Sequence, residues 1–100
     1  MDPFNIVIRS KEGKQIDLNL HPQEAGTYKV IYHGALIGEI FMGSNDRNWE
    51  ALTAEQLEPG GFPVYQYDEN SGHEYIMLDE KTIQEIGQKI TESQSGNNSE

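Results

Sequence analysis

Apolar and polar side chains alternate along the first twenty residues in two runs that share a midpoint at Gly13. Folding the chain back at Lys11-Glu12-Gly13, with the glycine in the left-handed region, sets each apolar residue of one run opposite an apolar residue of the other. The pairs are Phe4 with Leu20, Ile6 with Leu18, and Ile8 with Ile16. Because one register satisfies all three pairs, the sequence predicts a β-hairpin at the start of the chain.

A second hairpin is predicted from two segments rich in β-branched, aromatic and other apolar residues, Thr27 to His33 and Leu36 to Met42. Gly34-Ala35 between them fits a two-residue type II′ turn with glycine first. The facing pairs in this register are Tyr32 with Ile37 and Tyr28 with Phe41. The opposite face is apolar as well, so we expect these strands to lie at the centre of the sheet or between layers.

The segment after the second hairpin leaves two interpretations open. Trp49-Glu50-Ala51-Leu52 is too short to assign from its period, and it is either a brief strand or the lead-in to a helical turn. The next residues have the spacing of a capping box, with Thr53 able to cap and Gln56 able to reach back. This spacing predicts a short helix through Glu58.

The last third of the chain predicts a third hairpin and a helix. Val64 to Tyr67 and Glu74 to Leu78 flank a polar turn around Asn70-Ser71-Gly72. Asp79 follows and can cap a helix that carries a narrow apolar stripe. The stripe consists of Ile83, Ile86 and Ile90. We expect the helix to lie on the sheet through these isoleucines.

Together these elements predict a single α+β domain over residues 1–92. Its antiparallel sheet has about five or six strands built from β-hairpins, with a C-terminal α-helix packed on one face and a short helix near residues 53–58. Ser93 to Glu100 contains no side chain that needs burial, so residues 93–100 are expected to form a flexible polar tail.

Charge is distributed unevenly in this chain, which has a formal net charge of -10. There is no Lys or Arg between Arg47 and Lys81, and most of the negative charge lies in the second half. Such a surface repels phosphate backbones, so we expect no direct nucleic-acid binding. It would instead steer a basic protein partner toward the domain.

Two further features bear on the class of protein. The chain has no cysteine, which excludes disulfide scaffolds, thiol nucleophiles and thiolate zinc sites. Met1-Asp2-Pro3-Phe4 has neither a positive region nor an apolar stretch before the first predicted strand. We therefore expect no signal peptide, no membrane span and a cytoplasmic location.

No combination of residues predicts catalysis or a cofactor. His21, His33 and His73 fall on separate connections, and no nucleophile, base and orienting group can be named together, so we expect no enzyme. The loop 68–74 offers oxygen ligands that would suit calcium, but its glycine falls one position early and no helix leads into it. We therefore interpret this loop as a polar hairpin turn and expect no metal site.

Aromatic and acidic side chains are interleaved in the second half of the chain, which is a composition typical of interfaces with basic proteins. The candidate partner-binding residues are Trp49, Tyr65, Tyr67, Asp68, Glu69, Glu74 and Tyr75. The alternative is that most of these aromatic residues fill the core.

The leading hypothesis from sequence is a small acidic, non-catalytic protein-interaction domain that binds a basic partner. One specific form of it is an inhibitor or immunity-type protein that occupies the cationic groove of a nucleic-acid-processing protein. The alternative is a small-molecule or metal-binding regulatory domain that uses the cleft between sheet and helix. A homo-oligomer formed through an uncovered sheet edge is compatible with both hypotheses.

Overall fold

A computed structural model describes residues 2–10, 12–24, 26–43, 48–57, 63, 70 and 76–95. The elements are β1 (Phe4–Arg9), β2 (Gln15–Pro22), β3 (Tyr28–Tyr32), β4 (Ala35–Met42), β5 (Trp49–Thr53), the 3₁₀ turn η1 (Ala54–Gln56) and α1 (Glu80–Ser95). The five strands form one antiparallel sheet whose spatial order follows the chain, β1-β2-β3-β4-β5. The predicted α+β class, with a hairpin-built sheet and a C-terminal helix, is confirmed.

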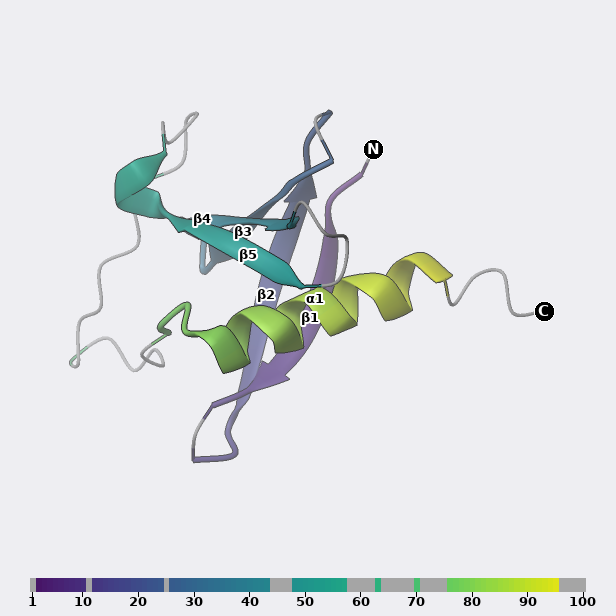
Figure 1. Ribbon diagram of the computed structural model, residues 1–100. Helices are drawn as coiled ribbons and strands as arrows, with labels where there is room; N and C mark the ends of the chain where they lie inside the picture. The colour runs from purple at the N-terminus through teal and green to yellow at the C-terminus, as the bar shows by residue number, and fades with distance from the viewer. Residues whose placement is uncertain are drawn as a thin grey trace.

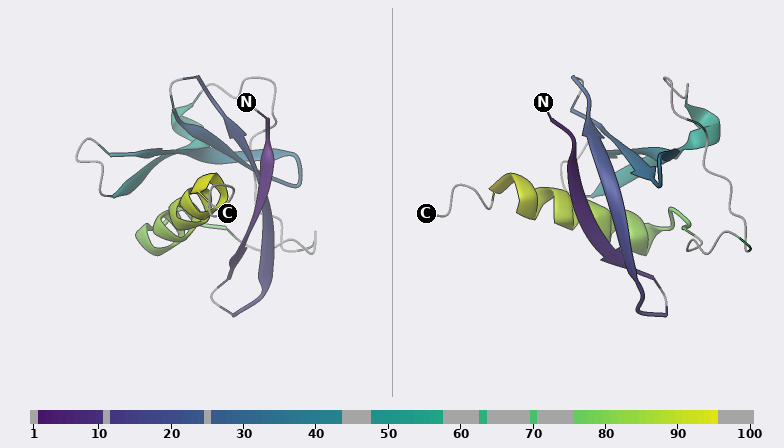
Figure 2. Two further views of the ribbon diagram at one scale, coloured as in Figure 1. Left: turned by 90° about the vertical axis from the view of Figure 1, so that its right-hand side faces the viewer. Right: turned by 180° about the vertical axis from the view of Figure 1, so that it is seen from behind.

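The sheet is strongly bent, and its two halves run in clearly different directions (Figure 1). β1 and β2 stand across the direction of β3, β4 and β5, and α1 lies in the angle between the two halves (Figure 2). The helix contacts both edge strands, β1 and β5, and also β4. One helix therefore covers the concave face and reaches from one edge of the sheet to the other.

The first hairpin has the register that the sequence predicts. Phe4 pairs with Leu20, and every following pair up to Arg9 with Gln15 agrees. Gly13 has a φ of 84°, the left-handed conformation that glycine adopts without steric cost. The apolar side chains of both strands point to one face and are buried against α1 and its neighbours. Local turn chemistry and burial select the same register, so the prediction is correct.

The second hairpin turns one residue earlier than the sequence predicts. Its turn residues are His33 and Gly34, with φ values of 50° and 81°, and Tyr32 pairs with Ala35. Two consecutive positive φ values define a type I′ turn, whose twist matches that of the strands. The type II′ turn at Gly34-Ala35 is wrong because His33 adopts the left-handed region.

The predicted facing pairs of this hairpin are consequently wrong. Tyr32 does not face Ile37, and Tyr28 pairs with Ile40 rather than Phe41. The register also shifts between Val30 and Ile31, where the ladder is irregular. This shift could not be deduced from turn chemistry, because an inserted residue changes the pairing beyond it without changing the turn.

Apolar side chains are buried on both faces of the second hairpin, as expected. The main core lies between the sheet and α1, and its most deeply buried members are Leu18, Leu20, Val30, Ile40, Ile86 and Ile90. A smaller cluster forms on the other face from Ile31, Leu36 and Ala54, with Leu57 against it. Two layers of burial explain why the hairpin lacks a polar face.

The open assignment at Trp49 is settled in favour of a strand, β5. The capping box that follows is confirmed, because Gln56 Oε1 accepts the backbone N–H of Thr53 at 2.8 Å. The helical turn ends at Gln56, and Glu58 lies outside the described residues.

Only part of the predicted third hairpin can be compared with the structure. The described residues 76–78 are not in a strand, which contradicts the predicted strand Glu74 to Leu78 at its end. The segment Val64 to Tyr67 and the turn at Ser71-Gly72 lie outside the described residues.

The C-terminal helix is capped and packed as predicted. Asp79 Oδ1 accepts the N–H of Thr82 at 2.8 Å, which is the N-cap geometry. Ile86 and Ile90 are buried and Ile83 packs against the same cluster. The helix continues to Ser95, three residues into the segment 93–100 that was expected to be a tail.

A glycine in the middle of α1 accommodates the indole of Trp49. A Cβ at Gly87 would overlap the ring. Glycine is less favourable than alanine in a helix interior by about 1 kcal/mol. Trp49 also lies 6.2 Å from Tyr28 between ring centroids, and Tyr28 lies 6.1 Å from Phe4. The glycine therefore serves the packing of an aromatic row between the sheet and the helix.

We expect Gly87→Ala to lower the free energy of unfolding by about 1–3 kcal/mol, the usual cost of overpacking, although alanine is the better helix former. Urea unfolding measures this change, and the fluorescence of the one tryptophan in the chain reports a displaced ring. Gln88→Ala, which alters an exposed residue of the same helix, is the control. In a Trp49→Leu background, which removes the overlapping ring, Gly87→Ala should no longer lower the free energy of unfolding. A Gly87→Ala protein as stable as the parent would contradict the packing argument.

Candidate interaction site

Of the predicted partner-binding residues, the structure describes only Trp49. Its side chain is partly buried against the main core and contacts α1 at Gly87. The remaining candidates, Tyr65, Tyr67, Asp68, Glu69, Glu74 and Tyr75, lie outside the described residues, as does most of the loop 68–74. Their role as a surface for a basic partner stays a prediction.

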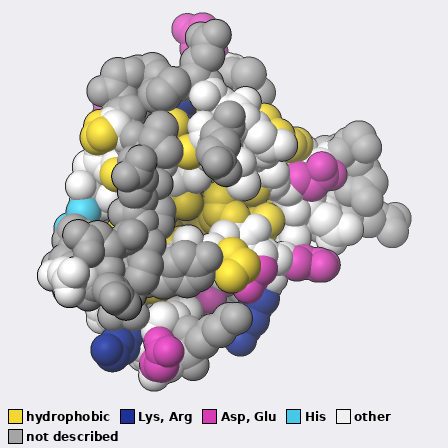
Figure 3. All heavy atoms as spheres, turned by 90° about the vertical axis from the view of Figure 1, so that its left-hand side faces the viewer, with side chains coloured by type: hydrophobic (Ala, Val, Ile, Leu, Met, Phe, Trp, Pro, Cys, Tyr) yellow, Lys and Arg dark blue, Asp and Glu magenta, His cyan; other side chains and the backbone are white. Residues whose placement is uncertain are grey.

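Acidic side chains of the described residues do not gather in one patch on the face seen from the left-hand side of Figure 1. They are spread around its margin, and Lys and Arg side chains lie beside them at the lower edge (Figure 3). Apolar side chains are visible in the middle of this face. The described acidic residues therefore form no concentrated acidic surface on this face.

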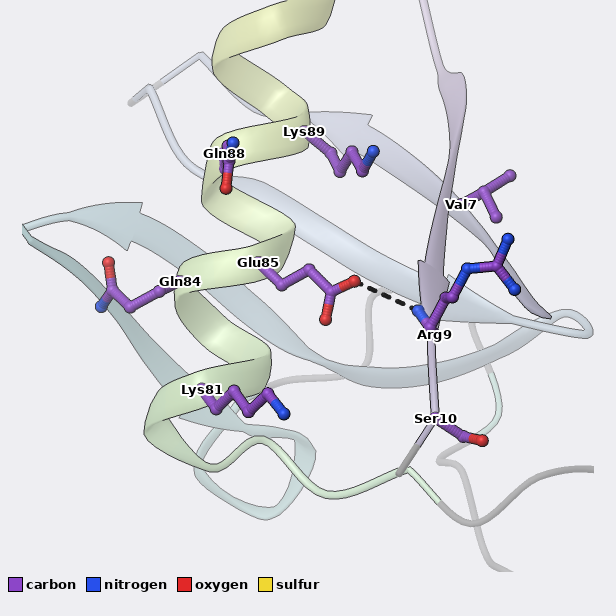
Figure 4. Close-up of a pocket in the computed structure, with 8 residues that line it drawn as sticks. All are labelled: Val7, Arg9, Ser10, Lys81, Gln84, Glu85, Gln88 and Lys89. Carbon is purple, nitrogen blue, oxygen red and sulfur yellow. Dashed lines mark hydrogen bonds between the residues drawn. The ribbon is translucent and has the colours of Figure 1, made fainter. Parts of the chain in front are cut away.

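Consecutive residues of α1 bind the two opposite edges of the sheet. The Gln84 side chain donates to the carbonyl of Trp49 at 2.9 Å and accepts its N–H at 3.4 Å, as a neighbouring strand would. Glu85 Oε2 accepts the N–H of Arg9 at 3.1 Å on β1. The first contact caps β5, and the second crosses the space beside β1 (Figure 4).

The free edge of β1 carries unpaired backbone groups. The N–H of Arg9 points away from β2 to Glu85, whereas that of Ser10 points inward and donates to Lys14 O at 2.8 Å. Backbone groups alternate in direction along an antiparallel strand, so Val7 and Asn5 also direct their N–H and C=O outward. Within the described part of the chain, no hydrogen bond satisfies these groups. Val7 is also 41% exposed.

A groove of about 620 Å³ runs between this edge and α1 (Figure 4). Val7, Arg9 and Ser10 line it from the strand side. The helix side is lined by Lys81, Gln84, Glu85, Gln88 and Lys89. The groove therefore joins a row of free backbone hydrogen-bonding groups to a polar helix face.

The groove has the opposite sign of charge to the chain as a whole. Lys81 and Lys89 against Glu85 give the charged side chains that face it a net of +1, whereas the chain carries -10. Lys81 and Lys89 lie on the helix one turn either side of Glu85, and all three side chains extend toward β1 (Figure 4). Arg9 turns away from α1 and donates to Gly13 O at 3.0 Å.

The groove's lining offers one hydroxyl group, two amides, three cationic groups and one carboxylate. Its hydroxyl group, Ser10 Oγ, accepts the N–H groups of Glu12 and Lys14 and belongs to the hairpin turn. None of the groove's lining residues is a histidine. Among the described residues no group of three or more His, Cys, Asp or Glu could hold a metal ion. No helix of the described part has the length and apolar character needed to cross a membrane.

Sequence reasoning named a cleft between sheet and helix in general terms, but it identified none of the residues that line this groove. Three charged residues four positions apart lie on one face of the predicted helix, namely Lys81, Glu85 and Lys89. This spacing can be read from the sequence. Which strand that face would meet depends on the strand order, which the sequence does not reveal.

Comparison of the chain with protein-family models, curated proteins and solved structures found no match.

We expect Gln84→Ala to lower the free energy of unfolding by about 1–2 kcal/mol, because two backbone groups of Trp49 lose their partner. Hydrogen exchange at the Trp49 amide should accelerate more than exchange in β2. Gln88→Ala is the matched control, since its amide donates only to the exposed Glu92. Unchanged protection at Trp49 would contradict the capping role.

Proposed function

We propose that this protein is a non-catalytic interaction domain that binds an extended segment of a partner protein along the free edge of β1. The observation that carries the proposal is the row of outward N–H and C=O groups at Asn5 and Val7 beside an open groove. A peptide added to a sheet edge gains affinity from backbone hydrogen bonds and specificity from alternate side chains. A cytoplasmic location is part of this proposal.

The hydrogen bond between Glu85 and Arg9 supports this mode of binding. The carboxylate occupies the position where a carbonyl oxygen of an added strand would accept the same N–H. When a peptide binds along the full groove, its carbonyl replaces Glu85 and the carboxylate turns aside. Glu85 is then a built-in competitor of the peptide.

The two edges of the sheet differ in how they are protected. On β5, side chains accept the N–H groups of Trp49 and Thr53. Natural sheets blunt their edges with prolines, bulges and charges that discourage pairing. Neither edge strand contains a proline or a register shift, but among the described residues β1 has only one side-chain acceptor for its outward N–H groups, Glu85, and it exposes the β-branched Val7. β1 is therefore the edge better suited to receive another strand.

A small-molecule regulatory domain would use the same space between sheet and helix. The unpaired strand edge favours a peptide instead, because its backbone groups repeat at the spacing of another strand.

We expect Val7→Pro to abolish peptide binding without unfolding the domain. Proline removes the outward N–H, and it is tolerated on an edge strand because the ladder to β2 does not use that group. Peptides selected from a random display library against the parent protein serve as probes, with affinities from fluorescence anisotropy. Val7→Ala keeps the N–H and is the control. A library that yields no binder, or binders insensitive to Val7→Pro, would refute strand addition at β1.

We expect Glu85→Ala to move stability and affinity in opposite directions. The variant loses an exposed hydrogen bond to Arg9, so its free energy of unfolding falls by about 1 kcal/mol. The same selected peptides should bind several-fold more tightly, since the competing carboxylate is gone. A structural role alone would leave affinity unchanged or weaken it.

A further inference from the structure

We infer that the segment bound in the groove carries two acidic side chains four residues apart, a statement that rests on the proposed strand addition at β1. Lys81 and Lys89 extend toward β1 from the helix side of the groove (Figure 4). The inference follows from comparing the distance between these two lysines along the helix with the distance between side chains i and i+4 of a β-strand.

The cations are separated by eight helical residues. At 1.5 Å per residue this corresponds to about 12 Å along the helix axis. Residues i and i+4 of a strand point to the same face and are about 13 Å apart. Figure 4 shows Lys89 at the level of Val7 and Lys81 toward Ser10, so the pair spans the length of the groove. α1 crosses β1 obliquely (Figure 1), and the long lysine side chains adjust their reach, so two carboxylates at i and i+4 would meet the two ammonium groups together.

Glu85 restricts which side chain the bound segment can carry between the two acidic residues. It lies midway between Lys81 and Lys89, where residue i+2 of the bound strand would point. A carboxylate at i+2 would face Glu85 and be repelled, so this position takes a neutral or basic side chain. The residues at i+1 and i+3 point to the other face, beside Val7, where a β-branched side chain packs well.

The net charge of the chain does not prevent such binding. The Debye length is about 8 Å at physiological ionic strength, so exposed carboxylates farther away are largely screened. Lys81 and Lys89 would contact a bound carboxylate directly. Within the described residues they have few ion-pair partners. Lys89 Nζ lies 3.9 Å from Glu92, with both side chains substantially exposed, which is a weak pair.

A set of synthetic peptides tests the spacing. The host is a soluble, uncharged peptide of alternating threonine and valine, and its variants carry a glutamate pair at a spacing of two, four or six residues. A lysine pair at a spacing of four is the charge control. We expect the glutamate pair at four to bind about 4- to 25-fold more tightly than the host at low salt. High salt should remove most of this advantage.

Substitutions in the groove test which residues recognise the pair. Lys81→Gln and Lys89→Gln should each lower the affinity for the peptide with glutamates four residues apart by about two- to fivefold. The affinity for the uncharged host peptide should not change. Lys29→Gln on β3 makes the same charge change outside the groove and should have little effect.

The outcomes separate the two proposals. If the glutamate, lysine and uncharged peptides bind equally well and Val7→Pro abolishes all binding, strand addition stands and acidic recognition is refuted. Tightest binding at a spacing of two or six also refutes the inferred register. If none of these peptides binds and the random library yields no binder, both proposals fail.

Discussion

The attachment of α1 to both edges of one bent sheet is the constraint on which the rest of this structure depends. Four consecutive residues each make a different contact. Gln84 caps the backbone of Trp49 on β5, Glu85 binds Arg9 on β1, Ile86 is fully buried, and Gly87 admits the indole ring. Among the described residues α1 is the one helix that covers the sheet, and through these contacts it joins the two halves. A change in any of them alters the position of one edge relative to the core.

This constraint also explains why the two edges are unequal. The aromatic row from Phe4 through Tyr28 to Trp49 draws β5 onto the helix at Gly87, where Gln84 can satisfy both backbone groups of Trp49. On the opposite side the Glu85 side chain reaches the Arg9 N–H of β1, and a groove lies between the helix and that edge. Tight packing at one edge thus accompanies open space at the other. The candidate site is a consequence of where the buried side chains place the helix.

Sequence reasoning succeeded where the determining interactions are local. The register of the first hairpin follows from Gly13 and from alternation, and the helix follows from Asp79 and its isoleucine stripe. It failed at the second hairpin, where His33 takes a positive φ and the ladder shifts between Val30 and Ile31. The apolar pattern indicated burial on both faces of this hairpin, but it does not specify where one strand gains a residue relative to the other. Prediction thus identified β1 to β4 and α1, left β5 open, missed one register and placed the end of a strand at residues 76–78, where the structure has none.

The candidate site was harder to predict. A site made of free backbone groups has no side-chain signature, and its existence depends on which strand lies at the edge. The lysines at positions 81 and 89 are visible in the sequence, but their significance appears only when β1 is known to face them. The aromatic and acidic candidates were chosen by side-chain type alone, and that criterion cannot detect an unpaired strand.

A cationic groove on an acidic protein has a consequence for the choice of partner under the proposed function. A long polyanion such as nucleic acid extends beyond the groove and meets the carboxylates of the remaining surface, so the net charge of -10 repels it. A short acidic segment that ends within the groove gains the contacts to Lys81 and Lys89 while avoiding most of that repulsion. The acidic surface then repels long polyanions, and the two lysines attract a short acidic segment. Specificity is the difference between the binding free energies of these two kinds of ligand. The acidic surface and the cationic groove both increase that difference in favour of the short segment.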